Sequence, residues 1–360
     1  MSGQIDEILL KKEFDKQDII FLLQTNKQEA KKLFKAALET KLKYTDNKVR
    51  LRGLIEYSNI CRKRCLYCGL RNSTIKVDRY TLTDEEYFSC IEQAIKLNYG
   101  SIALQSGERQ NEEFINKIEY LIKKTKEISN NSIGITLSLG EQTKETYKRW
   151  FLAGAHRYLL RIEASDEDLY YKIHQNDELH SYKTRIDCLQ NLTEIGYQVG
   201  TGVMIGLPFQ TIDNLANDIL FFKRMQVAMI GMGPYIPHPS TPLWQYRDTI
   251  PTKEERMFMT LKMIAITRLV MPQINMVSAT ANQTIDPLGR EKAIQVGANV
   301  IMPNLSPTEF RTDYDIYPDK ACVQDTAEQC ASCLEIRMRS INHTILYNDW
   351  GDSLYFKKHH

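Results

Sequence analysis

The sequence has 360 residues, and its 47 lysines and arginines nearly balance 45 aspartates and glutamates, for a formal net charge of +2. The charges are spread along the chain, which argues against the basic stripe that holds a nucleic-acid backbone. We find neither a signal-peptide pattern nor an apolar run of membrane-spanning length, so we expect a cytoplasmic protein that binds neither nucleic acid nor a membrane.

Residues 1–48 predict an N-terminal helical cap. Apolar side chains recur at helical spacing between residues 14 and 44, among lysines and glutamines. This pattern is typical of two helices that each expose one face to solvent.

From residue 49 onward, β-rich runs alternate with longer amphipathic stretches of helical period. The runs that predict strands are 49–59, 101–106, 134–140, 157–164, 198–206, 229–237, 274–280 and 299–304. Strand and helix repeated eight times indicate an α/β protein with a TIM-type (β/α)8 parallel barrel over residues 49–310. An open doubly wound sheet is the alternative. In a barrel, reactive groups are expected at the C-terminal ends of the strands.

Residues 311–360 form a C-terminal extension. It carries a second group of cysteines, and we interpret its final residues, His359 and His360, as the remnant of an expression tag.

Three of the eight cysteines lie in the loop after the first predicted strand, SNICRKRCLYCGLR (residues 58–71). Cys61, Cys65 and Cys68 follow neither helical nor strand periodicity, so we expect the loop to bring three sulfurs together. Thiolates are soft ligands for zinc or iron–sulfur centres. A structural zinc ion normally has four protein ligands, and this loop offers no fourth. Three thiolates on a 4Fe-4S cluster would leave one iron free to bind a small molecule.

The residues between the first two cysteines are all cationic. Arg62, Lys63 and Arg64 are expected to favour the thiolate form of the neighbouring cysteines.

The Cys-x3-Cys-x2-Cys spacing, with Tyr67 before the last cysteine, resembles the signature of the radical S-adenosylmethionine (SAM) superfamily. Further segments resemble, within its biotin synthase-like branch, the maturases of iron-only (FeFe) hydrogenase of the HydE type. These segments include ALQSGE (103–108), RYLLRIEAS (157–165), GVMIGLPFQT (202–211) and GPYIPHPSTPL (233–243), and the resemblance runs from about residue 48 to 335.

This resemblance implies that a 4Fe-4S cluster binds SAM and cleaves it reductively to a 5′-deoxyadenosyl radical. It also implies a role in assembling the binuclear iron centre of FeFe hydrogenase. The implied substrate is a cysteine-bound iron carbonyl/cyanide precursor.

The resemblance further implies that SAM is contacted by Tyr67, Ser106, Gly107, Glu108, Glu163, Arg185, Ile205 and Leu207. Glu163 is implied for the ribose and Arg185 for the SAM carboxylate, and glycine at position 107 allows a close approach. The alternatives are surface salt bridges for Glu163 and Arg185 and core positions for Ile205 and Leu207.

A polar substrate cavity is implied, lined by Gln105, Thr136, Arg161, Thr280, Met302 and Tyr314. Each unsatisfied buried polar group costs roughly 1–3 kcal/mol, so such side chains need partners or a ligand. Ala279 precedes Thr280 where the family pattern has paired threonines, which is expected to alter anion contact there. His238 lies between prolines in a loop, which is more typical of a structural residue than of a base.

The second group consists of Cys322, Cys330 and Cys333, for which the resemblance implies an auxiliary 2Fe-2S or 4Fe-4S cluster at the surface. The alternatives are zinc or no metal. Cys90 and Cys188 fall within predicted helices, where we expect buried, small apolar residues.

The resemblance implies a small organometallic or amino-acid-derived substrate, an electron donor such as ferredoxin or flavodoxin, and other hydrogenase maturases as partners. Two other functions remain open. A methylornithine synthase-like lysine mutase would use the same cluster but is expected to lack the second cysteine group. A non-enzymatic metal carrier would not cleave SAM.

Overall fold

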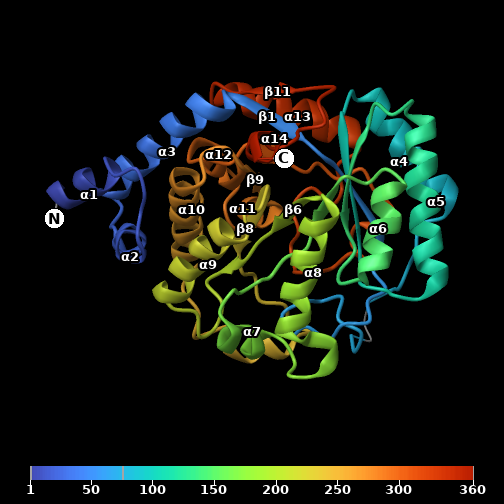
Figure 1. Cartoon of the computed structure of the whole chain (residues 1–360), viewed down its shortest axis with the longest axis horizontal. Coiled ribbons are helices and arrows are strands. Elements are labelled where there is room, and N and C mark those ends of the chain that lie inside the picture. The colour runs from blue at the N-terminus through green and yellow to red at the C-terminus, as the bar shows by residue number, and fades with distance from the viewer. Residues whose placement is uncertain (1, 75–76, 360) are drawn as a thin grey trace.

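In the computed structural model, which describes residues 2–74 and 77–359, parallel strands form a ring with helices outside it (Figure 1). The strands are β1 (Lys48–Leu51), β2 (Gly53–Ser58), β3 (Ser101–Ser106), β4 (Gly134–Ser138), β5 (Arg157–Leu159), β6 (Gln198–Thr201), β7 (Met204–Ile205), β8 (Met229–Pro234), β9 (Asn275–Ser278), β10 (Val300–Ile301) and β11 (Thr344–Leu346). The helices are α1 (Ser2–Leu9), α2 (Lys16–Gln24), α3 (Ala30–Thr45), α4 (Asp84–Lys96), α5 (Glu112–Ile128), α6 (Lys144–Leu152), α7 (Glu167–Ile173), α8 (Tyr182–Ile195), α9 (Ile212–Arg224), α10 (Lys253–Val270), α11 (Thr280–Ile285), α12 (Gly289–Gln295), α13 (Ala327–Ser340) and α14 (Leu354–His359). None of the helices in these described ranges combines the length and apolar character needed to cross a bilayer. His360, half of the predicted tag remnant, lies outside the described residues.

β1 and β2 close the ring. They are two halves of the single strand predicted over 49–59, and only Arg52 separates them. β1 pairs in parallel with β10 and β2 with β3, while Leu54 bridges to Asn304 just beyond β10. The remaining order is β3-β4-β5-β6-β8-β9-β10, with all pairs parallel, which confirms the predicted barrel.

The predicted strand over 198–206 is also divided, into β6 and β7. β6 pairs with the first part of β8 and β7 with its last two residues, Gly233 and Pro234. The predicted span was therefore right, but the chain leaves the regular ladder between the two pieces.

The N-terminal cap has three helices, because α1 precedes the two that the spacing predicts. Asp15 caps the N-terminus of α2, and its side chain accepts a hydrogen bond from the Asp18 backbone N–H in a reciprocal capping box. The apolar face of α3, which includes Leu33 and Ala37, is buried, and α3 packs against α10 while α2 packs against α9. The cap, blue in Figure 1, thus extends the outer helical layer on the side of α9 and α10.

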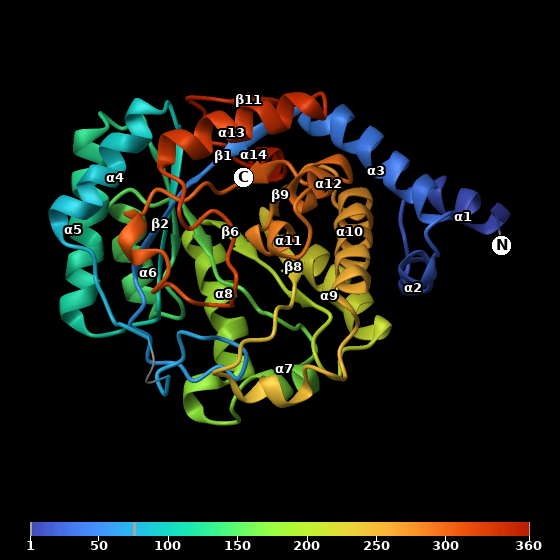
Figure 2. The ribbon, with the colours of Figure 1, turned by 180° about the vertical axis from the view of Figure 1, so that it is seen from behind.

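The last part of the C-terminal extension, from β11 onward, closes the N-terminal end of the barrel. β11 pairs in parallel with β1, and the segment after it lies beside Arg157, the first residue of β5. Arg157 Nη1 donates to the Asp352 carboxylate at 2.7 Å and to the Trp350 carbonyl at 2.6 Å. Figure 2 shows β11, α13 and α14 together at this end, and the loop with the first cysteines at the opposite end.

Candidate active site

A cavity of about 390 Å³ lies at the C-terminal end of the barrel. Cys61, Cys65 and Cys68 all line it, together with residues from the ends of β3, β5, β8 and β9. In parallel barrels this is the end where catalytic side chains gather, because the loops that follow the strands surround it.

The three thiols lie in surroundings that disfavour negative charge. Burial raises the pKa of Cys61, and burial together with the neighbouring Cys61 raises the pKa of Cys65 to about 12. Burial also raises the pKa of Cys68, with smaller contributions from the other two thiols. Lys63 lowers the pKa of Cys61 and of Cys65, as expected of an adjacent cation, but in the chain alone the opposite effect of burial is larger. A bound metal centre would supply the missing positive charge, since a coordinated thiol is deprotonated.

The donor set is consistent with an iron–sulfur group. Within the described ranges, no three His, Cys, Asp or Glu side chains, the loop cysteines included, are arranged to hold a single metal ion. Three soft sulfur donors around one cavity suit a multinuclear group that offers a metal atom to each of them.

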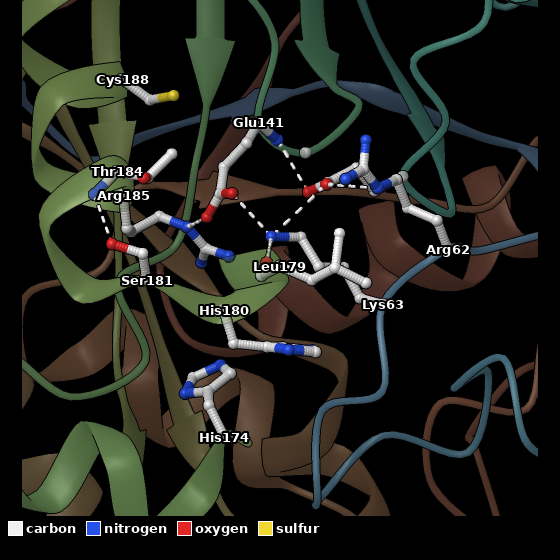
Figure 3. Close-up of polar contacts among 12 residues, drawn as sticks. Arg62, Lys63, Glu141, His174, Leu179, His180, Ser181, Thr184, Arg185 and Cys188 are labelled. Atoms are coloured by element: carbon white, nitrogen blue, oxygen red, sulfur yellow. Dashed lines mark hydrogen bonds and ion pairs between the residues drawn. The ribbon is translucent and has the colours of Figure 1, made fainter. Parts of the chain in front are cut away.

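A buried network of four charges adjoins the cysteine loop. Lys63 Nζ lies 2.6 Å from Glu141 Oε2 and 3.4 Å from Glu108 Oε1, and it also donates to the Leu179 carbonyl. Glu141 Oε1 accepts a hydrogen bond from Arg185 Nε at 2.5 Å. Figure 3 shows Glu141 between the Lys63 ammonium and the Arg185 guanidinium. The four side chains are only 5–7% exposed, so two cations and two carboxylates balance one another away from solvent.

The two carboxylates come from adjacent strand ends. Glu108 follows β3 and Glu141 follows β4, and Glu108 Oε2 accepts the Glu141 backbone N–H at 2.8 Å. Glu108 Oε1 is buried and has no hydrogen-bond partner in the described part of the chain, because the Lys63 contact is too poorly aligned to count as one. This oxygen is therefore a vacant acceptor on a residue that lines the cavity.

A second ion pair occupies the end of β5. Arg161 Nε and Nη2 donate to the two oxygens of Glu163 at 2.7 and 2.8 Å, in a two-point pair. Glu163 has a φ of 65°, a left-handed conformation that a non-glycine residue rarely adopts. Such strain persists only where surrounding contacts enforce it, and here the Glu163 carboxylate is held by the cavity-lining Arg161.

The C-terminal extension supplies part of the cavity wall. Tyr314, Tyr317 and Lys320 all line the cavity, and the Tyr314 hydroxyl accepts a hydrogen bond from Gln105 Nε2 at 3.1 Å. Lys320 Nζ donates to both oxygens of the buried Glu56 at 2.9 and 3.0 Å. The substrate side of the cavity is thus completed by residues that lie more than 200 positions from the first strand.

His238 joins this extension to the cysteine loop in a structural role. Its Nε2 lies 2.8 Å from Asp315 Oδ2, and its Nδ1 accepts the Ser240 backbone N–H at 3.0 Å. A Cβ at Gly69 would stand 2.0 Å from the Asp315 carbonyl oxygen, so only glycine fits where the two segments meet.

Most of the predicted SAM and substrate residues meet in this cavity. Those that line it are Tyr67, Gln105, Ser106, Gly107, Glu108, Arg161, Glu163, Arg185, Thr280, Met302 and Tyr314. The Tyr67 hydroxyl lies 3.2 Å from His174 Nε2, which holds the aromatic ring beside the cysteines. Glu163 and Arg185 are buried, so the surface salt bridges that we considered for them are excluded.

Three predicted residues lie elsewhere. Ile205 is part of the main hydrophobic core, and Leu207 packs in a smaller cluster against Tyr67. Thr136 accepts a hydrogen bond from Arg157 Nε at 2.9 Å, at the N-terminal end of the barrel. It stands two residues too early in β4, and Ser138, about 7 Å further along the strand, lines the cavity instead.

The second cysteine group lies at the start of α13 and in the loop before it. On α13, Cys330 is buried and Cys333 is exposed, and their spacing of three residues makes them neighbours on the helix surface. Cys322, in the loop before α13, is partly buried and accepts a hydrogen bond from Gln283 Nε2 at 3.5 Å. None of the three lines the cavity. Cys90 and Cys188 are buried in α4 and α8, as expected.

Sequence reasoning missed the structural partners of the network. Glu141 follows Gly140 just beyond β4, and Glu108 follows Gly107 just beyond β3. This repeated Gly-Glu pair near adjacent strand ends is a sequence signal for the two carboxylates. No comparable sequence pattern indicates the contact between Lys320 and Glu56.

The comparisons with known proteins agree with this geometry. The family model described as the radical SAM superfamily matches residues 55–222, which include the cysteine loop and all four members of the charge network. The fold and the site thus define a radical SAM enzyme.

The FeFe hydrogenase maturase subunit HydE of Thermotoga maritima is 40% identical over 353 residues, which cover 98% of this chain and 97% of that protein. Within the superfamily, the chain belongs to the HydE family. Biotin synthase of Bacillus cereus is 25% identical over 270 residues, covering 74% of this chain and 77% of its own. The crystal structure of methylornithine synthase superposes with a TM-score of 0.80 at 20% identity, covering 96% and 97% of the two chains, and shows likeness of fold alone.

Proposed function

We propose that this protein acts in the cytoplasm as a maturase of FeFe hydrogenase. In this proposal it cleaves SAM reductively and uses the radical on a cysteine-bound iron carbonyl/cyanide precursor that another maturase supplies. Its electron donor is a ferredoxin or flavodoxin. The similarity to the HydE subunit over nearly the whole chain supports this assignment.

Cys61, Cys65 and Cys68 would hold the 4Fe-4S cluster. When bound, the reduced cluster supplies one electron to the SAM sulfonium, which releases methionine and a 5′-deoxyadenosyl radical. The chain's own part is to hold SAM in place: Glu108 Oε1 is a vacant acceptor for the ammonium group, and Arg185 offers a guanidinium to the carboxylate.

Glu163 is proposed to bind the ribose of SAM, and Tyr67 to contact the adenine. For both roles the side chain is already fixed, Glu163 by Arg161 and Tyr67 by His174. Fixed groups lose little entropy on binding and hold the radical carbon in one position.

The substrate is proposed to lie deeper, against Gln105, Tyr314, Thr280 and Met302. The charged side chains that line this part of the cavity form ion pairs of zero net charge, Arg161 with Glu163 and Lys320 with Glu56. A small molecule with both donor and acceptor groups suits such a wall better than a strongly charged one does. Cys322, Cys330 and Cys333 are proposed to hold an auxiliary 2Fe-2S or 4Fe-4S cluster outside this volume.

The observation that carries the proposal is that three cysteines share one cavity with Glu108 and Arg185. Anaerobic reconstitution with iron and sulfide, followed by reduction in the presence of SAM, should yield 5′-deoxyadenosine. Cys65→Ser should abolish this product. Cys90→Ser is the matched control, because the hydroxyl can replace the thiol that donates to the Glu86 carbonyl far from the cluster.

A gene-replacement experiment tests the hydrogenase assignment separately. In a cell that makes FeFe hydrogenase, deletion should abolish hydrogen evolution, and the intact gene but not the Cys65→Ser variant should restore it. Unchanged hydrogen evolution after deletion would refute the maturase role while leaving SAM cleavage standing.

A further inference from the structure

Lys63 has an unusual place for a lysine. It lies inside the cysteine loop, between two proposed cluster ligands, yet its side chain is only 5% exposed and its ammonium is surrounded by oxygens. Its ammonium contacts Glu141, Glu108 and the Leu179 carbonyl. A buried ammonium needs such partners, because its desolvation is otherwise prohibitive.

Glu141 is shared between Lys63 and Arg185. One carboxylate oxygen, Oε2, faces Lys63 Nζ at 2.6 Å, and the other, Oε1, accepts from Arg185 Nε at 2.5 Å (Figure 3). The cysteine loop and helix α8 are therefore joined through a single side chain at the end of β4.

This bridge leaves one nitrogen of Arg185 available. Nε is held by Glu141, and Nη1 donates to the Arg161 carbonyl at 2.6 Å. The structure gives Arg185 no further hydrogen bond to the described residues beyond these two, which leaves Nη2 as the nitrogen that can donate to a ligand, and Arg185 lines the cavity. Two fixed nitrogens set the plane of the guanidinium and so determine where the third can donate.

The charges count as follows. Among the buried side chains Lys63 and Arg185 oppose Glu108 and Glu141, for a sum of zero, and the partly exposed Arg62 lies 3.9 Å from Glu108 Oε1 at the edge of this network. If Lys63 lost its charge, two buried carboxylates would face one guanidinium. A ligand carboxylate approaching Arg185 Nη2 would then meet a site with one buried positive charge fewer.

We propose that Lys63 and Glu141 are positioning residues for SAM: Glu141 orients Arg185 toward the SAM carboxylate, and Lys63 neutralises the extra carboxylate that this orientation requires. The inference rests on the proposed function in one respect, the placement of SAM at Arg185. It gives the lysine of the cysteine loop a task distinct from cluster ligation, and it couples the loop to the SAM site through one carboxylate.

The test measures SAM affinity and iron content separately. Wild-type protein, Lys63→Met and the double variant Lys63→Met/Glu141→Gln are reconstituted anaerobically. Iron per chain is determined chemically, and the Kd for SAM by anaerobic equilibrium dialysis. Lys183→Met is the matched control, since Lys183 forms an exposed ion pair with Asp187 on the same helix, α8.

Lys63→Met should keep the iron content of the wild type but bind SAM about 10–100-fold more weakly. The double variant restores the charge balance and should recover at least half of that loss on a logarithmic scale. Lys63→Arg, which keeps the charge, should stay within about threefold of the wild type. A role in packing alone predicts the opposite order, with the double variant no better than Lys63→Met.

These measurements distinguish a failure of the proposed function from a failure of the inference about Lys63 and Glu141. If the iron-loaded wild type does not bind SAM, the proposed function itself is wrong. If the wild type binds SAM and Lys63→Met binds it equally well, only the present inference is overturned. It is also overturned if both Lys63→Met and the double variant lose their iron, because Lys63 would then be needed for the cysteine loop itself.

Discussion

Lys320 Nζ lies 2.9 Å from Glu56 Oε1, and this ion pair fastens the C-terminal extension to the first half of the barrel. Glu56 is 2% exposed and the Lys320 side chain 10%, so the contact is sheltered from solvent. Glu56 also accepts a hydrogen bond from Asn304 Nδ2 at 2.8 Å, just beyond β10. The wall of the cavity thus depends on a contact between distant parts of the chain.

Lys320→Met should lower the free energy of unfolding of the apoprotein by about 3–5 kcal/mol, because it leaves the Glu56 carboxylate buried without its cation. Urea unfolding followed by circular dichroism measures the change. The double variant Lys320→Met/Glu56→Gln removes both charges and should recover more than half of the loss. A Lys320→Met protein as stable as the wild type would show that the pair contributes nothing.

Gly107→Ala should reduce iron incorporation several-fold. A Cβ at Gly107 would stand 2.4 Å from the Ile60 carbonyl oxygen and 2.8 Å from Cys61 Cβ, so the backbone that carries the first cysteine must shift. Chemical iron analysis after reconstitution checks this. Gly3→Ala is the control, since a Cβ there meets no atom within 4 Å; equal iron in both variants would contradict the expectation.

Asp218 predicts a pH dependence of stability. It lies in α9, is 1% exposed, and burial raises its pKa to about 7. The folded protein keeps this proton to a higher pH than the unfolded chain, in which aspartates titrate near pH 4, so stability falls as pH rises between these values. Between pH 5 and pH 8 the wild type should therefore lose about 2–3 kcal/mol relative to Asp218→Asn.

Urea unfolding of both proteins at the two pH values measures this difference. The comparison isolates Asp218, because the other titrating groups are common to both proteins. A difference in stability that does not change with pH would mean that the Asp218 pKa is ordinary.

Cys333→Ser should lower the iron content by the amount that an auxiliary cluster holds, while the yield of 5′-deoxyadenosine stays within about twofold. Cys333 is exposed and lies outside the cavity lining, so the exchange should disturb neither folding nor the SAM site. Ser332→Ala, at the adjacent exposed position, is the control. Unchanged iron in Cys333→Ser would speak against an auxiliary cluster.

Local pattern was enough to predict the barrel. Alternating β-rich and amphipathic segments specify strands and helices because burial follows their periods of 2 and 3.6 residues. Small departures arose where a predicted strand is divided in two, at Arg52 and between β6 and β7. The sequence pattern did not predict helix α1, because its eight residues carry only a short apolar stripe.

The spacing of Cys61, Cys65 and Cys68 was equally local, since one loop carries all three sulfurs. Thr136 was misplaced because a strand's position along the barrel axis depends on its register with neighbouring strands, which a single sequence does not reveal. Register put Ser138, and not Thr136, at the cavity.

By itself, the sequence determined the alternation of elements, the thiol loop and the family to which they point, because each depends on residues close together in the chain. Only the tertiary structure decided which charges face one another. Lys63, Glu141 and Arg185 come from three separate segments, and burial of a charge is tolerated only where folding brings an opposite charge to it. That pairing places Lys63, one of the three cations of the cysteine loop, against the carboxylates that follow β3 and β4.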